Sequence, residues 1–130
     1  MNDHRVHSLG RAFAGLSFLP DRKPDSDAAL VARAFATLAP YRDGQIFIGH
    51  YAGTSQWERH PRGDELVMVI DGQTELTIIV EGSEHRHRMV SGDVFVVPER
   101  HWHRFDTPEA VKVLTVTPQP TDHRLERPEG

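Results

Sequence analysis

The sequence contains no cysteine, and this absence excludes several kinds of chemistry at the outset. Thiolate catalysis and cysteine-based metal sites are impossible, and no disulfide can stabilise the fold. The lack of cysteine also fits a reducing compartment, so we expect a cytoplasmic protein. No apolar run approaches the length of a membrane span, and no apolar segment of signal-peptide length follows Met1. We therefore expect no association with a membrane.

An excess of positive charge is also missing. The 130 residues carry a formal net charge of -4 with neutral histidines, from 15 Lys and Arg against 19 Asp and Glu. Proteins that bind nucleic acids have a basic surface, so we expect no nucleic-acid partner. Histidine, by contrast, is abundant, with 9 residues. This abundance favours a metal site, although several of the imidazoles are expected at the surface.

The length of the chain predicts a single domain with terminal extensions. We divide it into an N-terminal arm over residues 1–25, the domain over residues 26–117 and a C-terminal tail over residues 118–130. Glycines and prolines interrupt the arm, which either docks through its apolar side chains or forms a partly ordered leader. The tail is rich in charge and proline, and we expect it to be poorly ordered or loosely docked.

One helix is predicted, over residues 26–38. Ser26 is a suitable N-cap, and Pro40 and Gly44 follow the helix and end it. Apolar residues recur at helical spacing between these signals and form one stripe: Leu30, Val31, Ala34, Phe35 and Leu38.

From residue 45 onward the pattern changes to short strands separated by turns. Glycine-containing turns such as Asp71-Gly72 lie between apolar segments, because glycine tolerates a positive φ. Short, evenly spaced strands favour an antiparallel sandwich or barrel. The predicted strands cover residues 45–52, 55–60, 65–70, 75–80, 85–90, 94–97, 103–105 and 111–117.

A carboxylate and an imidazole stand two residues apart at Glu58 and His60, with a second carboxylate at Glu65. In an extended segment, Glu58 and His60 point to the same face. Carboxylate and imidazole groups together suit Zn, Fe, Ni, Mn or Cu. The distant segment around His103 offers one more imidazole. The pattern outlines a metal site shared between two strands.

These spacings resemble the motifs of the cupin superfamily, and the sequence around His60 looks like that of its small single-domain bacterial members. The matching positions are His60, Glu65 and Gly72 in the first cupin motif and Gly92, Pro98 and His103 in the second. The sequence departs from the motifs in four places. Glu58 replaces the first histidine, Arg100 a glycine and Thr107 an asparagine, while Ala52 occupies the position of the leading glycine, with Gly53 displaced by one.

The resemblance implies an all-β fold, a cupin-type antiparallel β-barrel or jelly roll over about residues 45–117, preceded by one helix. It also implies a divalent transition metal (Fe, Mn, Ni or Zn) held by His60, Glu65 and His103. The role of Glu58 stays open. It is a fourth ligand, a general base beside the metal, or a polar residue of the pocket.

Four other histidines and both tryptophans are further candidates for the site or its surroundings. His101 is an alternative ligand, a hydrogen-bond donor behind the ligands or a residue of the rim, and His50 is a weak pocket candidate. His85 and His87 are expected on a solvated strand face. Trp57 and Trp102 each neighbour a proposed ligand, so we expect them to pack behind the ligand strands.

Two classes of function follow. The first is a metal-dependent enzyme acting on a small organic or sugar-like molecule inside the barrel, with oxygenase, isomerase and lyase chemistry all open. The second is a non-catalytic module that binds a small ligand or a metal. The near-complete ligand set favours the enzyme, and the lack of a further clear acid–base pair favours the binder. We also expect a homodimer formed by exchange of a strand or of the arm.

Overall fold

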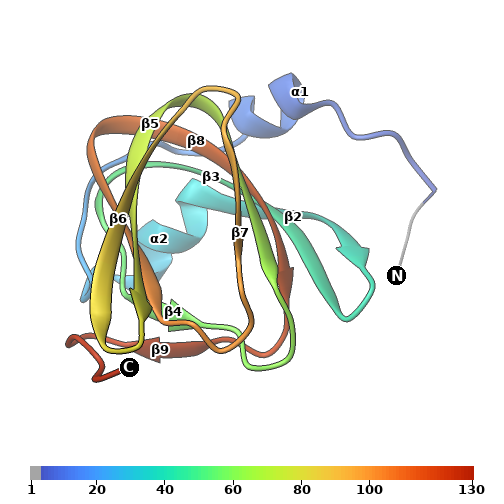
Figure 1. Ribbon diagram of the computed structural model, residues 1–130. Coiled ribbons are helices and arrows are strands. Elements are labelled where there is room, and N and C mark those ends of the chain that lie inside the picture. The colour runs from blue at the N-terminus through green and yellow to red at the C-terminus, as the bar shows by residue number, and fades with distance from the viewer. Residues whose placement is uncertain (1–3) are drawn as a thin grey trace.

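Antiparallel strands make up most of the structure, a computed structural model that describes residues 4–130 (Figure 1). Two short helices precede or interrupt the first strands: α1 (Leu9–Ala14) and α2 (Ala28–Ala34). The strands are β1 (Leu19–Arg22), β2 (Phe35–Tyr41), β3 (Gly44–Thr54), β4 (Trp57–Arg59), β5 (Glu65–Val80), β6 (Ser83–Val90), β7 (Val94–Val97), β8 (His103–Pro118) and β9 (Asp122–Arg124). The predicted all-β class is confirmed.

The two longest strands, β5 and β8, organise the sheet. They pair antiparallel with each other over most of their length, from Leu66↔Val116 to Ile78↔His103. β3 continues the sheet beside β8, and β6 and β7 pair with β5. The strands curve around a common interior without closing completely, which is the arrangement of a jelly roll (Figure 1).

The strands predicted over residues 65–70 and 75–80 form one continuous strand, β5, so the turn expected at Gly72 is instead a bend within it. The register against β8 shifts on both sides of this bend. Gly72 has φ +82°, and a Cβ there would lie 2.2 Å from the carbonyl oxygen of Ala110. Glycine is needed because the two backbones approach closely. The segments 103–105 and 111–117 likewise merge into β8.

The helix predicted over residues 26–38 is shorter than expected, since α2 covers only Ala28–Ala34. Asp27 rather than Ser26 caps it, because the Asp27 carboxylate accepts a hydrogen bond of 2.7 Å from the backbone N–H of Ala29. Residues 35–41 form β2, which pairs antiparallel with β3. Phe35 packs against the core as part of this strand. Pairing with β3 therefore outweighs the helical spacing of the apolar residues.

Both terminal segments are docked on the barrel. In the arm, which also contains the unpredicted α1, Phe13 is buried, and β1 pairs parallel with β3. In the tail, β9 pairs antiparallel with β4, and Arg127 hydrogen-bonds Glu84 at 2.7 Å. In the structure, both terminal segments thus contribute a strand that pairs with the rest of the fold.

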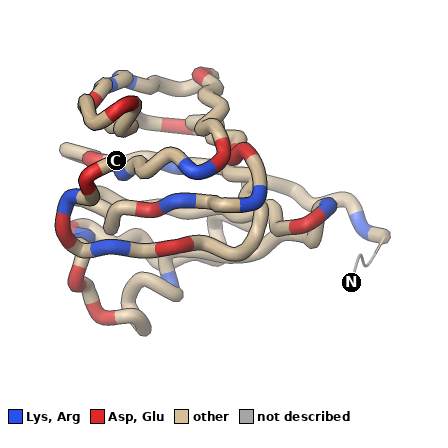
Figure 2. Tube along the Cα trace, turned by 60° about the horizontal axis from the view of Figure 1, so that its bottom comes forward, with Lys and Arg blue, Asp and Glu red and all other residues tan. Residues whose placement is uncertain are grey.

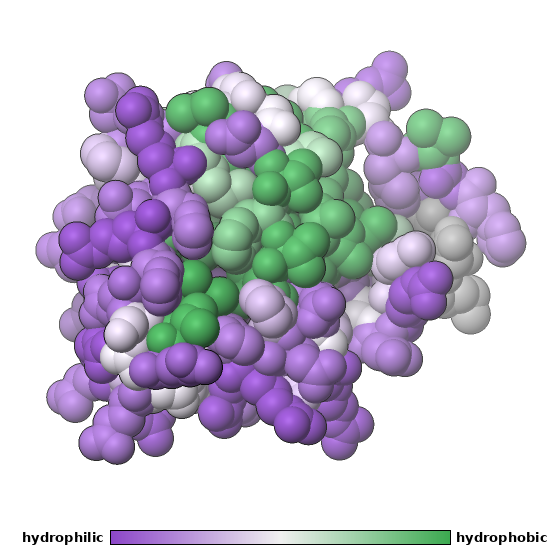
Figure 3. All heavy atoms as spheres, in the orientation of Figure 1, coloured by the Kyte–Doolittle hydropathy of each residue, from purple (hydrophilic) through white to green (hydrophobic). Residues whose placement is uncertain are grey.

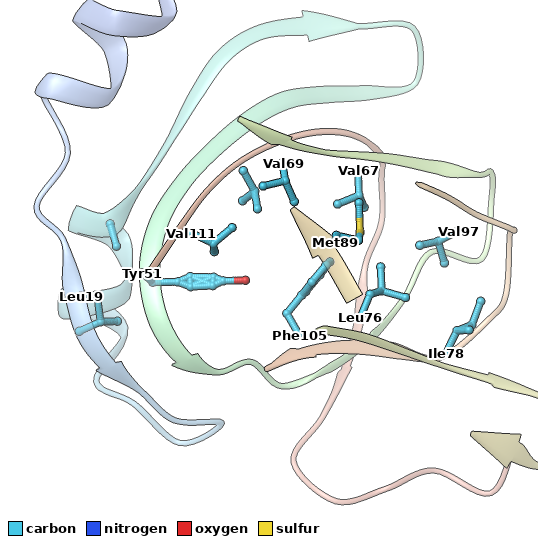
Figure 4. Close-up of a cluster of buried hydrophobic side chains, with 12 residues drawn as sticks. Leu19, Tyr51, Val67, Val69, Leu76, Ile78, Met89, Val97, Phe105 and Val111 are labelled. Atoms are coloured by element: carbon cyan, nitrogen blue, oxygen red, sulfur yellow. The ribbon is translucent and has the colours of Figure 1, made fainter. Parts of the chain in front are cut away.

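The barrel interior is filled by apolar side chains that alternate with outward-facing ones along each strand. Val67 and Val69 are fully buried, whereas their neighbours Leu66 and Met68 are only partly buried. Figure 4 shows side chains from several strands converging on this core, including Leu19, Tyr51, Leu76, Ile78, Met89, Val97, Phe105 and Val111. Three members of this core, Tyr51, Phe105 and Val113, also line a cavity.

Much of the outer surface is polar and carries both signs of charge (Figure 2). Figure 2 shows Lys and Arg interspersed with Asp and Glu along the chain. On β6, His85 and His87 are exposed among charged neighbours, as predicted. Neither helix in the described part of the chain has the length and apolar character that crossing a membrane requires.

Candidate metal centre

Three side chains with metal-binding atoms meet in the interior, and all three are buried. His60 follows β4, Glu65 begins β5 and His103 begins β8. Their exposed fractions are 3%, 5% and 0%. One ligand atom from each residue lies within 4.8 Å of those of the other two. The structure thus brings together the three residues that the cupin resemblance assigned to the metal.

Backbone pairing brings these residues together from distant parts of the chain. The Cα of His103 is paired with that of Glu58 on β4 and with that of Ile78 on β5. The loop before β8 is tied to β4 as well, because the N–H of Arg100 donates a hydrogen bond of 3.0 Å to the carbonyl of His60. The ligand positions are therefore set by the sheet and not by flexible loops alone.

Hydrogen bonds orient both imidazoles. His103 Nδ1 lies 3.1 Å from the carbonyl oxygen of His101. A carbonyl only accepts, so Nδ1 carries the proton and Nε2 faces Glu65 Oε1 at 3.0 Å. His60 Nδ1 lies 3.0 Å from the Thr121 hydroxyl. Partners of this kind on the outer nitrogen are typical of metal-binding histidines, because they fix the ring and its tautomer.

The remaining nitrogen of His60 fits a metal ligand. His60 Nε2 is 3.2 Å from Glu65 Oε1, but the pair lacks hydrogen-bond geometry, and this buried nitrogen has no hydrogen-bond partner among the described residues. A buried polar atom without a partner costs about 1–3 kcal/mol. A divalent cation bound to His60, His103 and Glu65 would satisfy this nitrogen and neutralise the carboxylate. The donor set suits Zn, Fe, Mn or Ni.

The electrostatics of the group depend on the carboxylate. Burial disfavours the charged form of Glu65, but the hydrogen bond and charge of His103, together with the close approach of the His60 ring, outweigh this effect and lower the pKa of Glu65 to about 2. Burial also disfavours the imidazolium of His103, yet the hydrogen bond and charge of Glu65 prevail and raise the pKa of His103. Thr117 donates a further hydrogen bond of 2.6 Å to Glu65 Oε2. The carboxylate is thus held ionised against the histidines.

Glu58 lies beside this group but is not a member of it. Its side chain lines the same cavity, and its Oε2 is 3.9 Å from His123 Nδ1. Its role as a ligand or as a base is not tested by the geometry and stays a prediction.

The other candidates lie away from the ligand atoms. His101 is half-buried, with Nδ1 3.0 Å from the carbonyl oxygen of Glu99, and it contributes its own carbonyl to His103. The ring centroids of His50 and Phe18 lie 4.7 Å apart. Burial lowers the pKa of His50, and the positive charge of Lys112 lowers it further. Trp57 and Trp102 form a separate cluster with Ile79, behind the ligand strands as expected.

A cavity of about 480 Å³ adjoins His60 and Glu65. Apolar residues from the barrel strands, among them Phe47, Phe105 and Val113, line part of its wall, and Val31 of α2 covers one side. Residues 119–121 of the C-terminal segment complete the wall. This volume suits a small organic ligand.

Three residues of the site were missed in the sequence. Thr117 and Thr121 hold Glu65 and His60, and Arg22 lines the cavity. The spacing of Thr115 and Thr117, two apart in a predicted strand, was a usable signal for an inward polar face. Thr121 and Arg22 carried no comparable signal, because they lie in the terminal segments.

Comparison with family models matches residues 48–117, more than half of the chain, to the Cupin_2 family, described as a cupin domain. This range includes the three buried ligands but neither Arg22 nor Thr121. A search of curated protein sequences finds no significant match to this chain.

Several solved structures share the fold. A conserved protein of unknown function from Streptococcus pyogenes matches over 92% of this chain and 91% of its own, with 19% identity and a TM-score of 0.61. A cupin-2 domain protein from Shewanella frigidimarina matches over 65% and 79%, with 22% identity and a TM-score of 0.55. Hydroquinone 1,2-dioxygenase, solved with Cd²⁺ and 4-hydroxybenzonitrile, matches over 65% and 63%, with 14% identity and a TM-score of 0.55.

Proposed function

The chain belongs to the Cupin_2 family of cupin domains, and from this premise we propose that it is a metal-dependent enzyme acting on a small organic or sugar-like molecule in the barrel cavity. The observation that carries the proposal is the buried group of His60, Glu65 and His103. His60 and Glu65 line the cavity, and His60 Nε2 has no hydrogen-bond partner among residues 4–130. The dioxygenase that shares the fold was solved with a bound divalent cation, which supports the same kind of site here.

In this proposal His60, Glu65 and His103 hold a divalent ion, with Mn, Fe, Ni and Zn as candidates. The bound ion would supply Lewis acidity, which polarises an oxygen of the substrate and makes its proton easier to remove. The protein itself fixes the ligand side chains in place and keeps water away from the substrate. Thr121 and the His101 carbonyl fix the imidazoles, while apolar walls limit water around the substrate.

Glu58 is the proposed proton acceptor. Its carboxylate lines the cavity and is not one of the three clustered ligands. His123 lines the cavity as well, 3.9 Å away, so a carboxylate and an imidazole face the substrate space together. This acid–base pair, which is separate from the three proposed ligands, supports an enzyme over a module that only binds a ligand.

Elemental analysis of protein purified without a metal-affinity tag tests the proposal. We expect about one divalent ion per chain in the wild type, and loss of that ion in His60→Ala and His103→Ala, because each removes a buried ligand. His85→Ala is the matched control, since His85 is exposed on β6. Equal metal content in all four proteins would show that the site assignment is wrong.

Product formation from a panel of small organic and sugar-like compounds separates the two functional classes. The metal-loaded wild type is expected to convert at least one compound, and Glu58→Gln is expected to retain the metal while losing most of the turnover. Ligand binding without conversion across the panel would favour the non-catalytic module. A cytoplasmic location, suggested by the lack of cysteine, is part of the proposal.

We also propose a homodimer, formed through the outer face of the sheet. Figure 3 shows apolar atoms gathered over β7, β5 and β8. Val94 and Val96 are each 50% exposed there, next to Leu66 and Met68 in register. The arm is already docked on its own barrel, so this face replaces arm exchange as the proposed contact.

Light scattering tests this assembly. The wild type is expected to be a dimer at micromolar concentration, and Val94→Lys to be a monomer, because a buried lysine would lack a partner. Leu125→Lys, exposed in the C-terminal segment, is the control. A monomeric wild type would contradict the proposal.

A further inference from the structure

Arg22 reaches the cavity from outside the part of the chain that matches the cupin family. It is the last residue of β1, and its Cα is paired with that of Gly53 on β3. Gly53 has φ +104°, and a Cβ there would lie 2.1 Å from the backbone oxygen of Arg22. Because glycine permits this close approach, β1 lies directly against β3 and delivers the Arg22 side chain to the cavity wall.

Two aromatic rings hold the guanidinium of Arg22. Its Cζ lies 4.6 Å from the ring centroid of Tyr51 and 4.9 Å from that of Phe35. Figure 4 shows the Tyr51 ring extending from β3 into the barrel interior. Contacts with ring faces satisfy the charge only partly. The guanidinium also hydrogen-bonds the Tyr51 hydroxyl, so the other N–H groups of Arg22 are the available donors.

Within residues 4–130, no carboxylate forms an ion pair with Arg22, because the ion pairs found there all belong to other residues. The side chain is nevertheless half-buried at the cavity wall. A partly buried arginine without an acidic partner is a binding position for an anion that enters from solution, since bidentate pairing with a carboxylate is its preferred interaction.

The charges of the remaining wall agree with an anionic ligand. The cavity contains the carboxylates of Glu58 and Glu65 and the guanidinium of Arg22. Burial raises the pKa of Tyr51 to about 12, so its hydroxyl stays neutral. A divalent ion bound to the histidines would leave one net positive charge, which a single carboxylate balances. The rest of the wall is largely apolar, with Phe47, Phe105 and Val113.

We propose that the cavity binds a small monocarboxylate with an aromatic or similarly apolar body, whose carboxylate pairs with Arg22. This proposal names the ligand class of the site and rests on the proposed function for the presence of the metal. Arg22 selects the anion, and the aromatic wall packs against the body of the ligand.

Isothermal titration of benzoate and benzamide into the metal-loaded protein tests the proposal. The two probes share a ring and differ in charge, so we expect the wild type to bind benzoate at least about tenfold more tightly than benzamide. Arg22→Gln should weaken benzoate binding by about tenfold to a hundredfold and leave benzamide binding unchanged. Arg33→Gln, on the exposed side of α2, is the matched control and should bind benzoate as the wild type does.

Two results would overturn the proposal: equal affinity of the wild type for the two probes, or benzoate binding that Arg22→Gln leaves unchanged. The probe comparison on the wild type needs no variant, so it stands even if Arg22→Gln fails to fold. Metal content reports separately on the proposed function. If the wild type contains no metal but still binds benzoate more tightly than benzamide in a way that depends on Arg22, only the metal site is contradicted. If the wild type is fully loaded with metal but shows no such preference, only the anion proposal is contradicted.

Discussion

The proton on His103 determines when a metal can bind. Nδ1 already donates to the His101 carbonyl, so the metal must take the place of any proton on Nε2. Glu65 raises the pKa of His103 despite burial, so this proton persists to a higher pH than on a free histidine. Glu65 itself, with a pKa of about 2, stays ionised throughout the neutral range. Competition by the His103 proton therefore governs the pH dependence of binding.

We predict that zinc affinity rises with pH through the raised pKa of His103. Below that pKa, affinity should fall by about tenfold for each pH unit, because one proton is displaced for each ion bound. Competition with a chelator of known affinity, measured between about pH 5.5 and pH 8, checks this slope. An affinity that does not change with pH would contradict competition between the ion and the His103 proton.

Arg100 occupies a backbone conformation suited to glycine. It has φ +68°, in the left-handed region, at the position where the second cupin motif has a glycine. Its side chain is 75% exposed and lies 3.7 Å from Glu99, a contact of little energetic value. We predict that Arg100→Gly stabilises the fold by up to about 1 kcal/mol, since it relieves this conformation.

Urea denaturation measures the effect. Arg100→Ala serves as the control, because it removes the same side chain while retaining a Cβ, and it should give no gain. Equal stability of the glycine and alanine variants would mean that the left-handed conformation costs nothing here.

The ligand residues could be predicted from the sequence, whereas Thr121 and Arg22 could not. His60, Glu65 and His103 stand at spacings that two short motifs fix, and the sheet brings them together. Thr121 and Arg22 act through contacts formed only when the terminal segments dock. Local spacing contains no information about such contacts.

The C-terminal strand β9 is a working part of the site. It pairs with β4, which precedes His60, and Thr121 just before it holds His60 Nδ1. We predict that deletion of residues 119–130 lowers zinc affinity by about tenfold or more, since His60 loses its orienting partner and the cavity loses one wall.

Deletion of residues 125–130 alone is the control, because it leaves β9 and Thr121 in place. Zinc titration of the two truncated proteins should therefore separate them. If both bind as the full chain does, β9 does not support the ligands. Thr121→Ser and Thr121→Val distinguish the hydroxyl from the strand itself.

The elements differed in how well the sequence predicted them. β7 has the predicted bounds, because a short apolar run between two turns leaves no alternative. The helix predicted over residues 26–38 is longer than α2. Phe35 fits the apolar face of a helix and a strand equally well, and only its pairing with β3 decides between them. The sequence predicts two strands where the structure has one, β5. A glycine at a bend within a strand cannot be distinguished in a sequence from a glycine in a turn between strands.

For the molecule as a whole, the metal is expected to contribute to stability. Without an ion, the buried His60 Nε2 has no hydrogen-bond partner among the described residues, and an ion that binds only the folded state stabilises that state by mass action. We predict that zinc at about a hundredfold above its Kd raises the free energy of unfolding by about 2.7 kcal/mol, and that removal with a chelator lowers Tm by several degrees.

Scanning calorimetry of the metal-free and zinc-loaded proteins checks this effect. His103→Ala is the control and should show the same Tm in both conditions. An equal shift in the wild type and in His103→Ala would indicate zinc binding elsewhere.

The contacts that support the ligands join residues far apart in the chain: 61 positions between His60 and Thr121, 52 between Glu65 and Thr117, and 38 between Glu65 and His103. Closing such long loops is slow, so the ligand set is complete only late in folding. We therefore expect the ion to bind after the rate-limiting step of folding. It would lengthen the lifetime of the folded protein by slowing unfolding, while the refolding rate stays the same with or without metal.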